Sequence, residues 1–435
     1  MSPQELFAKV SGSIFVVEVV TQSGILITQG SAVAVAPDRI VTNKHVVIEG
    51  EKIIVIQGEK TWPAKVLKLS PRFDLCLLEV PGLNSDVQPA IRSLESLTIG
   101  ERVYAIGAPR GLELTLSDGL LSGIRRDETG PVVQTSAPIS PGSSGGGLFD
   151  GAGKLIGITT FTLRDSQELN FAIASQGIAE LTQQAPSATG QAWVGVGDQF
   201  MASATITNLS LPPLPSDLER QRLWGHRTEQ EMLPLRVKWI KATRAYREAL
   251  AFQPDDSAVL VKLGTAYAYL DAKDAASDAF TRAISMRHGD SSIWVEIGRA
   301  YERMNDRDDA LKAYQEAIHI HPGDASIWIA EANALAPDRR VEIAEALKTA
   351  EGLKPSNSAI WYTIGLAYQY RLNNYKEAET ALQEAVRLEP ENSGYLFALG
   401  QVYAVRRERS KAKEIYQRLK AIDSSTAELL LQTIH

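Results

Sequence analysis

A sequence repeat with a period of 34 residues runs through the second half of this 435-residue chain. Gly264 and Gly298 are 34 positions apart, and each lies in a short pattern of an aliphatic residue, glycine, any residue, alanine and tyrosine. A fixed period of this length predicts a stack of like units, because one unit cannot bury its apolar face alone. The apolar residues follow helical spacing, so each unit is predicted to be helical. The pattern and its variants occur at Leu263–Tyr267, Ile297–Tyr301, Ile364–Tyr368 and Leu399–Tyr403.

The repeat unit resembles the tetratricopeptide repeat, in which two helices pack through small residues and the second helix ends near a proline. Five near-complete units are predicted between residues 257 and 424, with a partial unit before them at 234–256 and a capping segment, Thr426–Ile434, after them. The resemblance implies a right-handed superhelix whose concave groove binds peptides or protein partners and performs no chemistry. The alternative, an ordinary helix bundle, does not explain the fixed period. The repeated pattern of the second helix ends at Pro254, Pro322 and Pro390.

The first half has a different pattern, in which short β-branched runs alternate with Gly, Pro, Asn and Asp between residues 13 and 160. Many short strands at this spacing predict a β-sandwich or a pair of barrels, and not alternating strands and helices. Residues 176–184 then indicate a short helix with Ser175 as its N-cap. Residues 193–209 have some β character, but the sequence alone does not assign them to a particular strand or domain.

Four glycines and three serines lie between Ile139 and Leu148. This density of glycine predicts a tight turn that another group approaches closely. A serine exposed on such a turn suits acyl transfer, because its hydroxyl attacks a carbonyl and neighbouring backbone N–H groups stabilise the oxyanion. The alternative is a flexible Gly/Ser turn between two strands. The choice depends on whether a base, and an acid that orients it, lie upstream.

His45 and Asp74 are candidates for that base and acid. His45 is the only histidine before residue 226, and it follows a predicted strand. Taken alone, such a histidine is more often structural, and an aspartate such as Asp74, at the start of an apolar strand, usually caps a turn. Together with Ser144, the two residues follow one of the chain orders known for the serine–histidine–aspartate triad.

The segments around these three residues resemble the signatures of trypsin-fold serine peptidases, and most closely those of the HtrA/DegP branch. The resemblance covers residues 8–184 and implies two packed six-stranded β-barrels, with the site in the crevice between them. No pattern typical of the PDZ domains that usually follow in this branch is present. The three segments are Thr42–Val47, Asp74–Val80 and Gly142–Gly146, and the scaffold segments that agree are Ala105–Leu112, Ser117–Ser122, Gln134–Ile139, Leu155–Thr159 and Asn170–Ser175.

The resemblance also implies a role for each residue of the site. Ser144, from the second barrel, is the nucleophile. His45, from the first barrel, accepts its proton and later delivers that proton to the leaving amine. Asp74 holds the imidazole in the correct tautomer and stabilises the imidazolium. The backbone N–H groups of Gly142 and Ser144 form the oxyanion hole.

The primary substrate pocket implied by the resemblance is uncharged. Pro138 stands at the position that carries the pocket charge in trypsin, Ile139 is next to it, and Thr159 and Thr160 lie on the wall strand. We therefore expect small or medium apolar side chains at the cleaved position. Ser143 replaces the asparagine of the HtrA branch and the aspartate of the digestive enzymes, so activation by a buried new N-terminal amine is not expected.

The composition of the chain excludes several classes of binding partner and cofactor. The net charge of −7 argues against nucleic acid or an anionic membrane surface as a partner, and no run reaches the ~18 apolar residues of a membrane span. Cys76 is the only cysteine, so no intrachain disulfide forms, and no histidine spacing suits a metal ion. We expect no metal and no cofactor. The N-terminus lacks signal-peptide features, which predicts a cytoplasmic location for this sequence and a periplasmic one if a leader has been removed.

These patterns predict a trypsin-like peptidase domain at residues 1–185, a linker at 186–222 with the proline-rich segment Leu211–Pro215, and a tetratricopeptide-repeat solenoid at 223–435. The leading hypothesis is a serine endopeptidase that cleaves protein or peptide substrates and binds a substrate or a regulatory protein in the repeat groove. One alternative is a catalytically inert or latent trypsin-like scaffold that acts as a protein–protein interaction module. Another is a non-peptidase acyl hydrolase. The oligomeric state, the natural substrate and the partner stay open.

Overall fold

A computed structural model describes residues 1–108, 114–127, 130–140, 142–162, 170–206, 229–287 and 289–434. The predicted proline-rich segment, Leu211–Pro215, lies outside these residues. The chain divides into two compact units. The first comprises Met1–Gln199 together with Arg244–Pro254, and the second comprises Phe200–Thr243 together with Asp255–His435.

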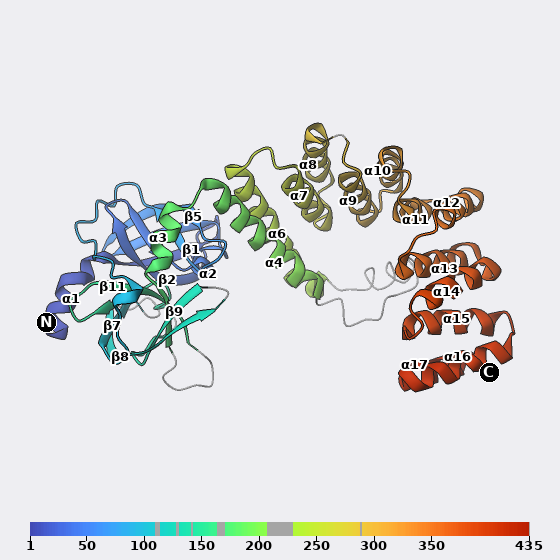
Figure 1. Cartoon of the computed structure of the whole chain (residues 1–435). Helices are drawn as coiled ribbons and strands as arrows, with labels where there is room; N and C mark the ends of the chain where they lie inside the picture. The colour runs from blue at the N-terminus through green and yellow to red at the C-terminus, as the bar shows by residue number, and fades with distance from the viewer. Residues whose placement is uncertain are drawn as a thin grey trace. The chain divides into compact units, whose positions relative to one another are not determined.

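The first unit contains two closed antiparallel β-barrels of six strands each, as the sequence predicted (Figure 1). The strands of the first barrel are β1 (Ile14–Val20), β2 (Leu26–Ala36), β3 (Arg39–Thr42), β4 (Lys52–Gln57), β5 (Lys60–Leu69) and β6 (Cys76–Glu79). Those of the second are β7 (Arg102–Gly107), β8 (Thr115–Asp127), β9 (Gly130–Thr135), β10 (Gly147–Asp150), β11 (Leu155–Thr162) and β12 (Asn170–Ala174). The hydrogen-bonded orders are β1-β2-β3-β6-β5-β4 and β10-β11-β12-β9-β8-β7. Closure leaves neither sheet with an unpaired edge.

The two barrels share an apolar core. Val33 and Leu77 of the first barrel lie in the same buried cluster as Tyr104 and Phe149 of the second. Helix α1, Pro3–Val10, adds its apolar face to this cluster. Burial of apolar surface contributes about 25 cal/mol per Å², so a continuous core stabilises the barrels as one body. Residues that come from different barrels are therefore held at fixed positions relative to one another.

Two helices follow the second barrel, and the sequence predicted only the first of them. Helix α3 spans Gln176–Gln183, in agreement with the prediction. Its predicted N-cap is wrong, because the hydroxyl of Ser175 donates to the carbonyl of Arg92 at 2.6 Å and makes no cap to the helix. Helix α4, Pro186–Ile206, lies where a linker and some β character were predicted. The predicted β character is therefore wrong for the residues that α4 covers, and residues 186–199 of the predicted linker group with the first unit.

Tertiary packing stabilises α4. The helix contacts the C-terminal part of α6 (Glu229–Phe252), and a Cβ added at Gly197 would lie 2.4 Å from the ring of Tyr246. Tyr246 also donates a hydrogen bond to Asp198 at 2.8 Å, and Trp193 is only 1% exposed. Glycine and β-branched residues lower the helix propensity of this segment, so its helical form depends on these contacts more than on its local sequence.

We expect a fragment that ends at Pro254 to be more stable than one that ends at residue 222, the predicted domain boundary. The longer fragment keeps Tyr246 against Gly197, whereas the shorter one exposes Trp193 and its neighbours. Loss of a buried aromatic side chain typically costs about 3–5 kcal/mol. Urea denaturation, monitored by circular dichroism, measures the difference in free energy of unfolding between the two fragments. Tyr246→Ala in the full chain removes the same aromatic contact by a single substitution. Equal free energies of unfolding would show that Arg244–Pro254 does not belong to the first unit.

The second unit contains the predicted helix pairs (Figure 1). The pairs are α7 (Ser257–Tyr269) with α8 (Lys273–Met286), α9 (Ser291–Arg303) with α10 (Arg307–Ile320), α11 (Ala325–Ala334) with α12 (Arg340–Gly352), α13 (Ser358–Leu372) with α14 (Tyr375–Leu388), and α15 (Ser393–Val405) with α16 (Arg409–Ile422). Helix α17, Ser424–Ile434, follows the last pair and packs against it. Each pair also contacts the next one along the series. This is the stacked architecture that the repeat period predicted.

A repeated cap starts the first helix of each pair. In all of them a side-chain oxygen accepts a hydrogen bond from a backbone amide of the first turn, which satisfies an otherwise unpaired donor. The caps are Asp256, Asp290, Asp324, Asn357 and Asn392. The turn before each of these helices is therefore specified by a short polar side chain.

The glycine of the repeat pattern allows the second helix of a pair to approach the first. A Cβ at Gly298 would lie 2.5 Å from the ring of Tyr314, which is fully buried. A Cβ at Gly264 would meet the ring of Phe280 at 2.3 Å in the same way. The repeated glycines therefore reflect a close helix–helix contact, and not a turn.

We expect Gly298→Ala to destabilise the second unit. Overpacking in a filled core costs about 1–3 kcal/mol, which exceeds the gain of at most about 1 kcal/mol in helix propensity. Gly323→Ala is the matched control, because a Cβ at Gly323 would meet no atom within 4 Å. Thermal unfolding of the two variants tests the contact, and a melting temperature of Gly298→Ala at or above that of the control would contradict it.

Candidate active site

The three predicted catalytic residues come from three loops of the first unit. His45 lies in α2, the short helix Lys44–Val47 that follows β3. Asp74 precedes β6, and Thr42 at the end of β3 pairs with Cys76 at the start of β6. Because the two strands are antiparallel, the residues after Thr42 and those before Cys76 lie at the same end of the barrel. Ser144 lies in the loop that leads into β10 of the other barrel.

The structure brings His45 and Asp74 into direct contact. Nδ1 of His45 lies 2.6 Å from Oδ2 of Asp74, and the backbone amide of His45 donates to Oδ1 at 2.9 Å. The hydroxyl of Thr160 donates to Oδ2 at 3.0 Å. An ionised carboxylate only accepts hydrogen bonds, so Nδ1 carries the proton and Nε2 is left with a lone pair that can act as a base.

The hydroxyl of Ser144 is directed to a different partner. Its Oγ donates to the backbone carbonyl of Thr160 at 2.9 Å, and among the described residues it makes no hydrogen bond to His45. Thr160 therefore contacts two of the predicted catalytic residues, Asp74 through its hydroxyl and Ser144 through its carbonyl. Rotation of the serine side chain would be needed before a proton could pass to the imidazole. Hydrogen bonds of this kind often tighten only when substrate is bound.

The carbonyl groups of Gly142, Ser143 and Ser144 are each anchored by a hydrogen bond. The hydroxyl of Ser31 donates to the carbonyl of Gly142 at 2.9 Å. The hydroxyl of Thr159 donates to that of Ser143 at 2.6 Å, and the amide of Ser31 donates to that of Ser144 at 2.7 Å. The carbonyl of one residue and the amide of the next share a rigid peptide plane and point in opposite directions, so the anchored carbonyl of Ser143 sets the direction of the Ser144 amide.

Two amides of this loop have no hydrogen-bond partner among the described residues. Those of Gly142 and Ser144 donate no hydrogen bond to any described residue, and they are the two that the sequence predicted as an oxyanion hole. Gly142 has a φ of 97°, in the left-handed region that favours glycine. Two unpaired N–H groups beside a serine hydroxyl can stabilise a developing negative charge. The other amides donate from Ser143 to Ser140, from Gly145 to Thr159 and from Gly146 to Ser143.

Gly145 is a position in this loop where a side chain has no room. Its φ is 90°, and an added Cβ would lie 1.9 Å from the carbonyl oxygen of Ser31 and 2.4 Å from the hydroxyl of Thr42. Both contacts come from the first barrel. The glycine after the serine therefore allows the loop of the second barrel to approach the first barrel.

The four predicted pocket residues lie in different environments. Pro138 is exposed and its carbonyl accepts a hydrogen bond from Ser117 at 2.6 Å, and Ile139 packs partly on the core of the second barrel. Thr159 and Thr160 are at most 5% exposed. Their hydroxyls are directed to the carbonyl of Ser143 and to Asp74, so these two side chains support the site more than they line a pocket.

Several residues that contact the site were not among the site residues predicted from the sequence, although Asn43 and Lys44 lie in the recognised segment Thr42–Val47. The side-chain Nδ2 of Asn43, a fully buried residue, donates to the backbone carbonyl of Asp74 at 2.9 Å. The ammonium of Lys44 donates to the carbonyl of Ser70 at 3.1 Å, and burial lowers the pKa of Lys44 although the charge of Asp74 opposes that shift. The contacts of Ser31 were also not predicted. Its one sequence signal is its place in a run of small residues on a strand, which permits close approach.

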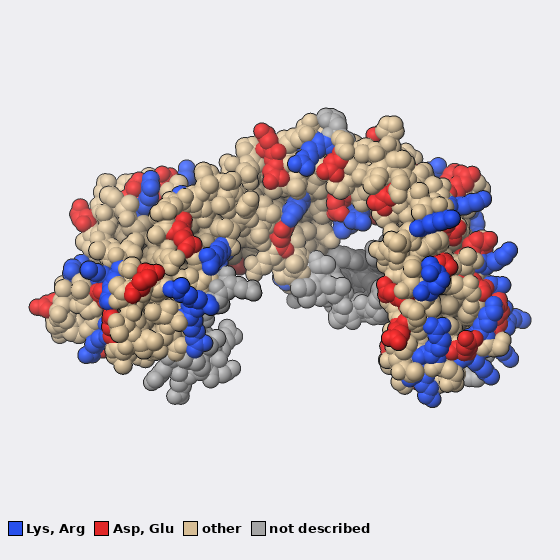
Figure 2. Space-filling model, viewed as in Figure 1, with Lys and Arg blue, Asp and Glu red and all other residues tan. Residues whose placement is uncertain are grey.

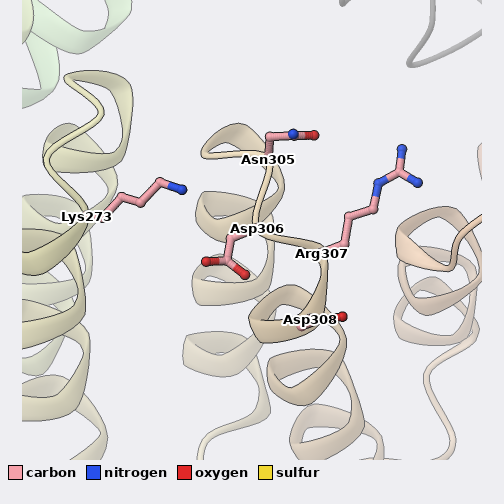
Figure 3. Close-up of a pocket in the computed structure, with 5 residues that line it drawn as sticks. All are labelled: Lys273, Asn305, Asp306, Arg307 and Asp308. Atoms are coloured by element: carbon pink, nitrogen blue, oxygen red, sulfur yellow. The ribbon is translucent and has the colours of Figure 1, made fainter.

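The second unit has an open hollow of about 590 Å³ at the turn between α9 and α10. In Figure 3 Lys273 extends toward this turn, whereas Arg307 points away from it. Asp306 already accepts a hydrogen bond from the amide of Asp309 as the N-cap of α10. The lining charges have mixed signs, and none of the predicted site residues lies there.

The part of the chain that the structure describes contains no cluster of His, Cys, Asp and Glu side chains arranged to hold a metal ion. None of the described helices combines the length and the apolar character needed to cross a lipid bilayer.

Comparisons with known families match the two units separately. A family model described as the trypsin-like peptidase domain matches residues 30–158, which include all three predicted catalytic residues. A second model, described as the C-terminal domain of cilia and flagella-associated protein 70, matches residues 235–428. Each model covers less than half of the chain.

Relatives of the first unit are serine proteases. A probable periplasmic serine endoprotease DegP-like of Pseudomonas fluorescens is 32% identical over 178 residues, which are 38% of this chain and 37% of that protein. Protease Do-like 1, chloroplastic, of Arabidopsis thaliana is 36% identical over 147 residues, 31% of this chain and 34% of that protein. The chain thus spans about a third of the length of the curated relatives it matches. Among solved structures, the serine endoprotease from Yersinia pestis matches with a TM-score of 0.39 and 29% identity over 42% of this chain and 66% of that one.

Proposed function

We propose that this chain, which joins a trypsin-like peptidase domain with HtrA/DegP-type relatives to a C-terminal domain of tetratricopeptide-repeat type, is a serine endopeptidase that cleaves protein substrates. One observation carries the proposal. The hydrogen-bonded pair of His45 and Asp74 lies in the same unit as a serine loop that is anchored through its carbonyls at 142–144. The amides of Gly142 and Ser144 in this loop have no partner in the described part of the chain. The homology of this unit to serine proteases supports the same reaction.

The first half of the reaction acylates the enzyme. Ser144 Oγ attacks the carbonyl carbon of the scissile bond while Nε2 of His45 takes the hydroxyl proton. The carbonyl oxygen becomes negatively charged and accepts hydrogen bonds from the Gly142 and Ser144 amides. When the C–N bond breaks, the imidazolium of His45 protonates the leaving amine. Asp74 stays ionised throughout, fixes the imidazole through Nδ1 and stabilises its positive charge.

The second half releases the acyl group. Water attacks the ester carbonyl of acylated Ser144 and gives a proton to Nε2 of His45. The oxyanion forms again at the two loop amides, and the ester bond breaks as His45 returns the proton to Ser144 Oγ. The atoms and charges of the enzyme are restored, and the net reaction is hydrolysis of one peptide bond.

Binding of substrate must redirect the serine hydroxyl. In the substrate-free protein Ser144 Oγ donates to the carbonyl of Thr160. In the acylation step it instead donates to His45. An intramolecular hydrogen bond between neutral groups contributes about 0.5–1.5 kcal/mol to stability. The free energy needed to exchange the Thr160 carbonyl for His45 is therefore small compared with the binding free energy that a bound peptide supplies.

The repeat domain supplies a second binding surface in this proposal. It either presents a protein substrate to the peptidase or restrains the peptidase until a protein partner binds. Figure 2 shows basic and acidic side chains mixed over the visible face of the second unit. Mixed charge suits a protein partner better than a polyanion such as nucleic acid. The relatives are named for the periplasm and the chloroplast, so we propose a periplasmic location if the natural protein carries a leader and a cytoplasmic one otherwise.

A fluorophosphonate probe and a digest of unfolded proteins test the proposal together. We expect one covalent adduct on Ser144, located by mass spectrometry, and cleavage sites inside substrate chains after small or medium apolar residues. Ser144→Ala is the control for both readouts. An adduct without any peptide-bond cleavage would indicate a non-peptidase acyl hydrolase. Absence of both, with and without added peptide ligands, would indicate an inert scaffold.

A further inference from the structure

Ser31 is a fully buried serine of the first barrel whose every polar group contacts the loops around Ser144 or His45. It lies on β2, and its amide donates to the carbonyl of Ser144 at 2.7 Å. Its hydroxyl donates to the carbonyl of Gly142 at 2.9 Å. These are the two residues whose own amides lack a partner among the described residues. One residue of the first barrel thus binds both of the candidate oxyanion residues of the second.

The direction of the Ser31 hydroxyl is specified by a further contact. The amide of Ala108, which follows β7, donates to Ser31 Oγ at 2.9 Å. Since that oxygen already accepts a hydrogen bond, its own proton is directed toward the remaining acceptor, the carbonyl of Gly142. The hydroxyl is therefore fully used as a donor and as an acceptor in a site without solvent.

The carbonyl of Ser31 connects the same residue to the histidine loop. It accepts a hydrogen bond from the hydroxyl of Thr42 at 2.7 Å. Thr42 is buried and ends β3, only three positions before His45. Ser31 therefore lies between the segment that carries the base and the loop that carries the nucleophile.

We propose that Ser31 is a positioning residue for the oxyanion hole: by holding the carbonyls of Gly142 and Ser144 it fixes the peptide groups directly before and after the one that carries the Ser144 amide, and so keeps that amide aimed at the oxyanion. The physical reason lies in the geometry of the peptide group. Planarity of the peptide bond leaves φ and ψ as the only soft backbone angles, so the peptide group between Ser143 and Ser144 can turn only against the two held groups on either side of it. Donors that are already aimed need no reorganisation when the charge develops, which is the source of their catalytic effect. The inference rests on the proposed function, because it assigns Ser31 to that reaction.

Ser31→Ala removes the hydroxyl and keeps the amide. The variant leaves the carbonyl of Gly142 and the amide of Ala108 without their partner, whereas the bond from the Ser31 amide to Ser144 is retained. Direct loss of an oxyanion donor typically costs about 10²- to 10³-fold in kcat. Because Ser31 acts on such a donor indirectly, we expect kcat to fall by about 10- to 100-fold with KM changed less than about twofold.

The test is made in the full chain with three measurements. Peptide hydrolysis and inhibitor binding both depend on an active site, whereas amide hydrogen exchange reports on the loop whether or not the protein is active. The substrate is a fluorogenic peptide built on a cleavage site mapped with the wild type, and the inhibitor is a peptidyl boronic acid of the same sequence. The boronic acid adds to the serine as a tetrahedral anion, so its Ki should rise by the same factor as kcat/KM falls. Hydrogen exchange of the amides of Ser143, Gly145 and Gly146 should become faster in Ser31→Ala, because the loop gains freedom.

Ser13→Ala is the matched control. Ser13 is also fully buried in the first unit, and its hydroxyl donates to the carbonyl of Val10 at 2.6 Å. This control should lose a similar amount of stability while kcat, Ki and loop exchange stay as in the wild type. The proposal for Ser31 is overturned if loop exchange does not change, or if the loss appears in KM and melting temperature instead of in kcat and Ki. If the wild type neither hydrolyses peptides nor binds the boronic acid, the proposed function fails, and the exchange measurement alone decides whether Ser31 holds the loop.

Discussion

Ser144→Ala is expected to lower kcat for peptide hydrolysis by about 10⁵- to 10⁶-fold, the size of effect seen when a triad nucleophile is removed. The methyl group cannot attack a carbonyl, so only the binding energy and the oxyanion donors remain. Stability should change little, because the hydrogen bond that is lost, from Ser144 to the carbonyl of Thr160, joins two groups in a partly buried site. Hydrolysis of a fluorogenic peptide and reaction with a fluorophosphonate probe measure the loss.

Ser122→Ala is the control for this variant. Ser122 is exposed on β8, and its hydroxyl donates only a 3.3 Å hydrogen bond to the carbonyl of Leu120 among the described residues. Ser122→Ala should react with the fluorophosphonate probe and hydrolyse the fluorogenic peptide at the wild-type rates. Comparable hydrolysis by Ser144→Ala and the control would mean that another group is the nucleophile.

Asp74→Asn is expected to lower kcat by about 10⁴-fold with the fold intact. The amide nitrogen of asparagine is a donor, so the imidazole of His45 would turn its lone pair at Nδ1 toward it and carry its proton on Nε2. That tautomer cannot accept the proton of Ser144. The lost charge also removes the stabilisation of the imidazolium. Steady-state rates and the rate of fluorophosphonate labelling should fall together, because both need an activated serine.

The matched control for the aspartate is Asp86→Asn. Asp86 is exposed on the first unit and has no ion pair among the described residues. We expect its rates to equal those of the wild type. A loss of less than tenfold in Asp74→Asn would show that Asp74 does not orient His45, and the hydrogen bond of 2.6 Å between them would then be structural only.

The candidate site was predictable to the extent that its chemistry lies in short segments. His45, Asp74 and Ser144 each lie in a recognisable segment of the sequence. In the structure Nδ1 of His45 contacts the carboxylate of Asp74, as the pattern predicted. The amides of Gly142 and Ser144 donate to no residue that the structure describes, so they are free in this part of the chain for the oxyanion role that the glycine-rich loop predicted. The hydrogen bond from Ser144 to Thr160 was not predictable, since the rotamer of a serine depends on acceptors from other strands.

Wrong sequence predictions in the first unit have one physical cause. Helix α4 has a glycine-containing sequence of low propensity, and Tyr246 of a distant segment stabilises it. Ser175 has the residue type of an N-cap, but its hydroxyl donates to the carbonyl of Arg92 and makes no cap hydrogen bond to α3. In both cases a tertiary partner outweighs a local preference of about 1 kcal/mol.

The sequence by itself determined which chemical groups are present and where periodic packing occurs. The order of His45, Asp74 and Ser144 and the 34-residue spacing of Gly264 and Gly298 are readable because motif and period act over short stretches. Only the tertiary structure decided that Ser31 binds the carbonyls of Gly142 and Ser144, and that Arg244–Pro254 belongs to the first unit. It also decided that the hydroxyl of Ser144 points to the carbonyl of Thr160. Those features depend on the directions of hydrogen bonds and on contacts between segments far apart in the chain, and no local pattern of residues specifies either.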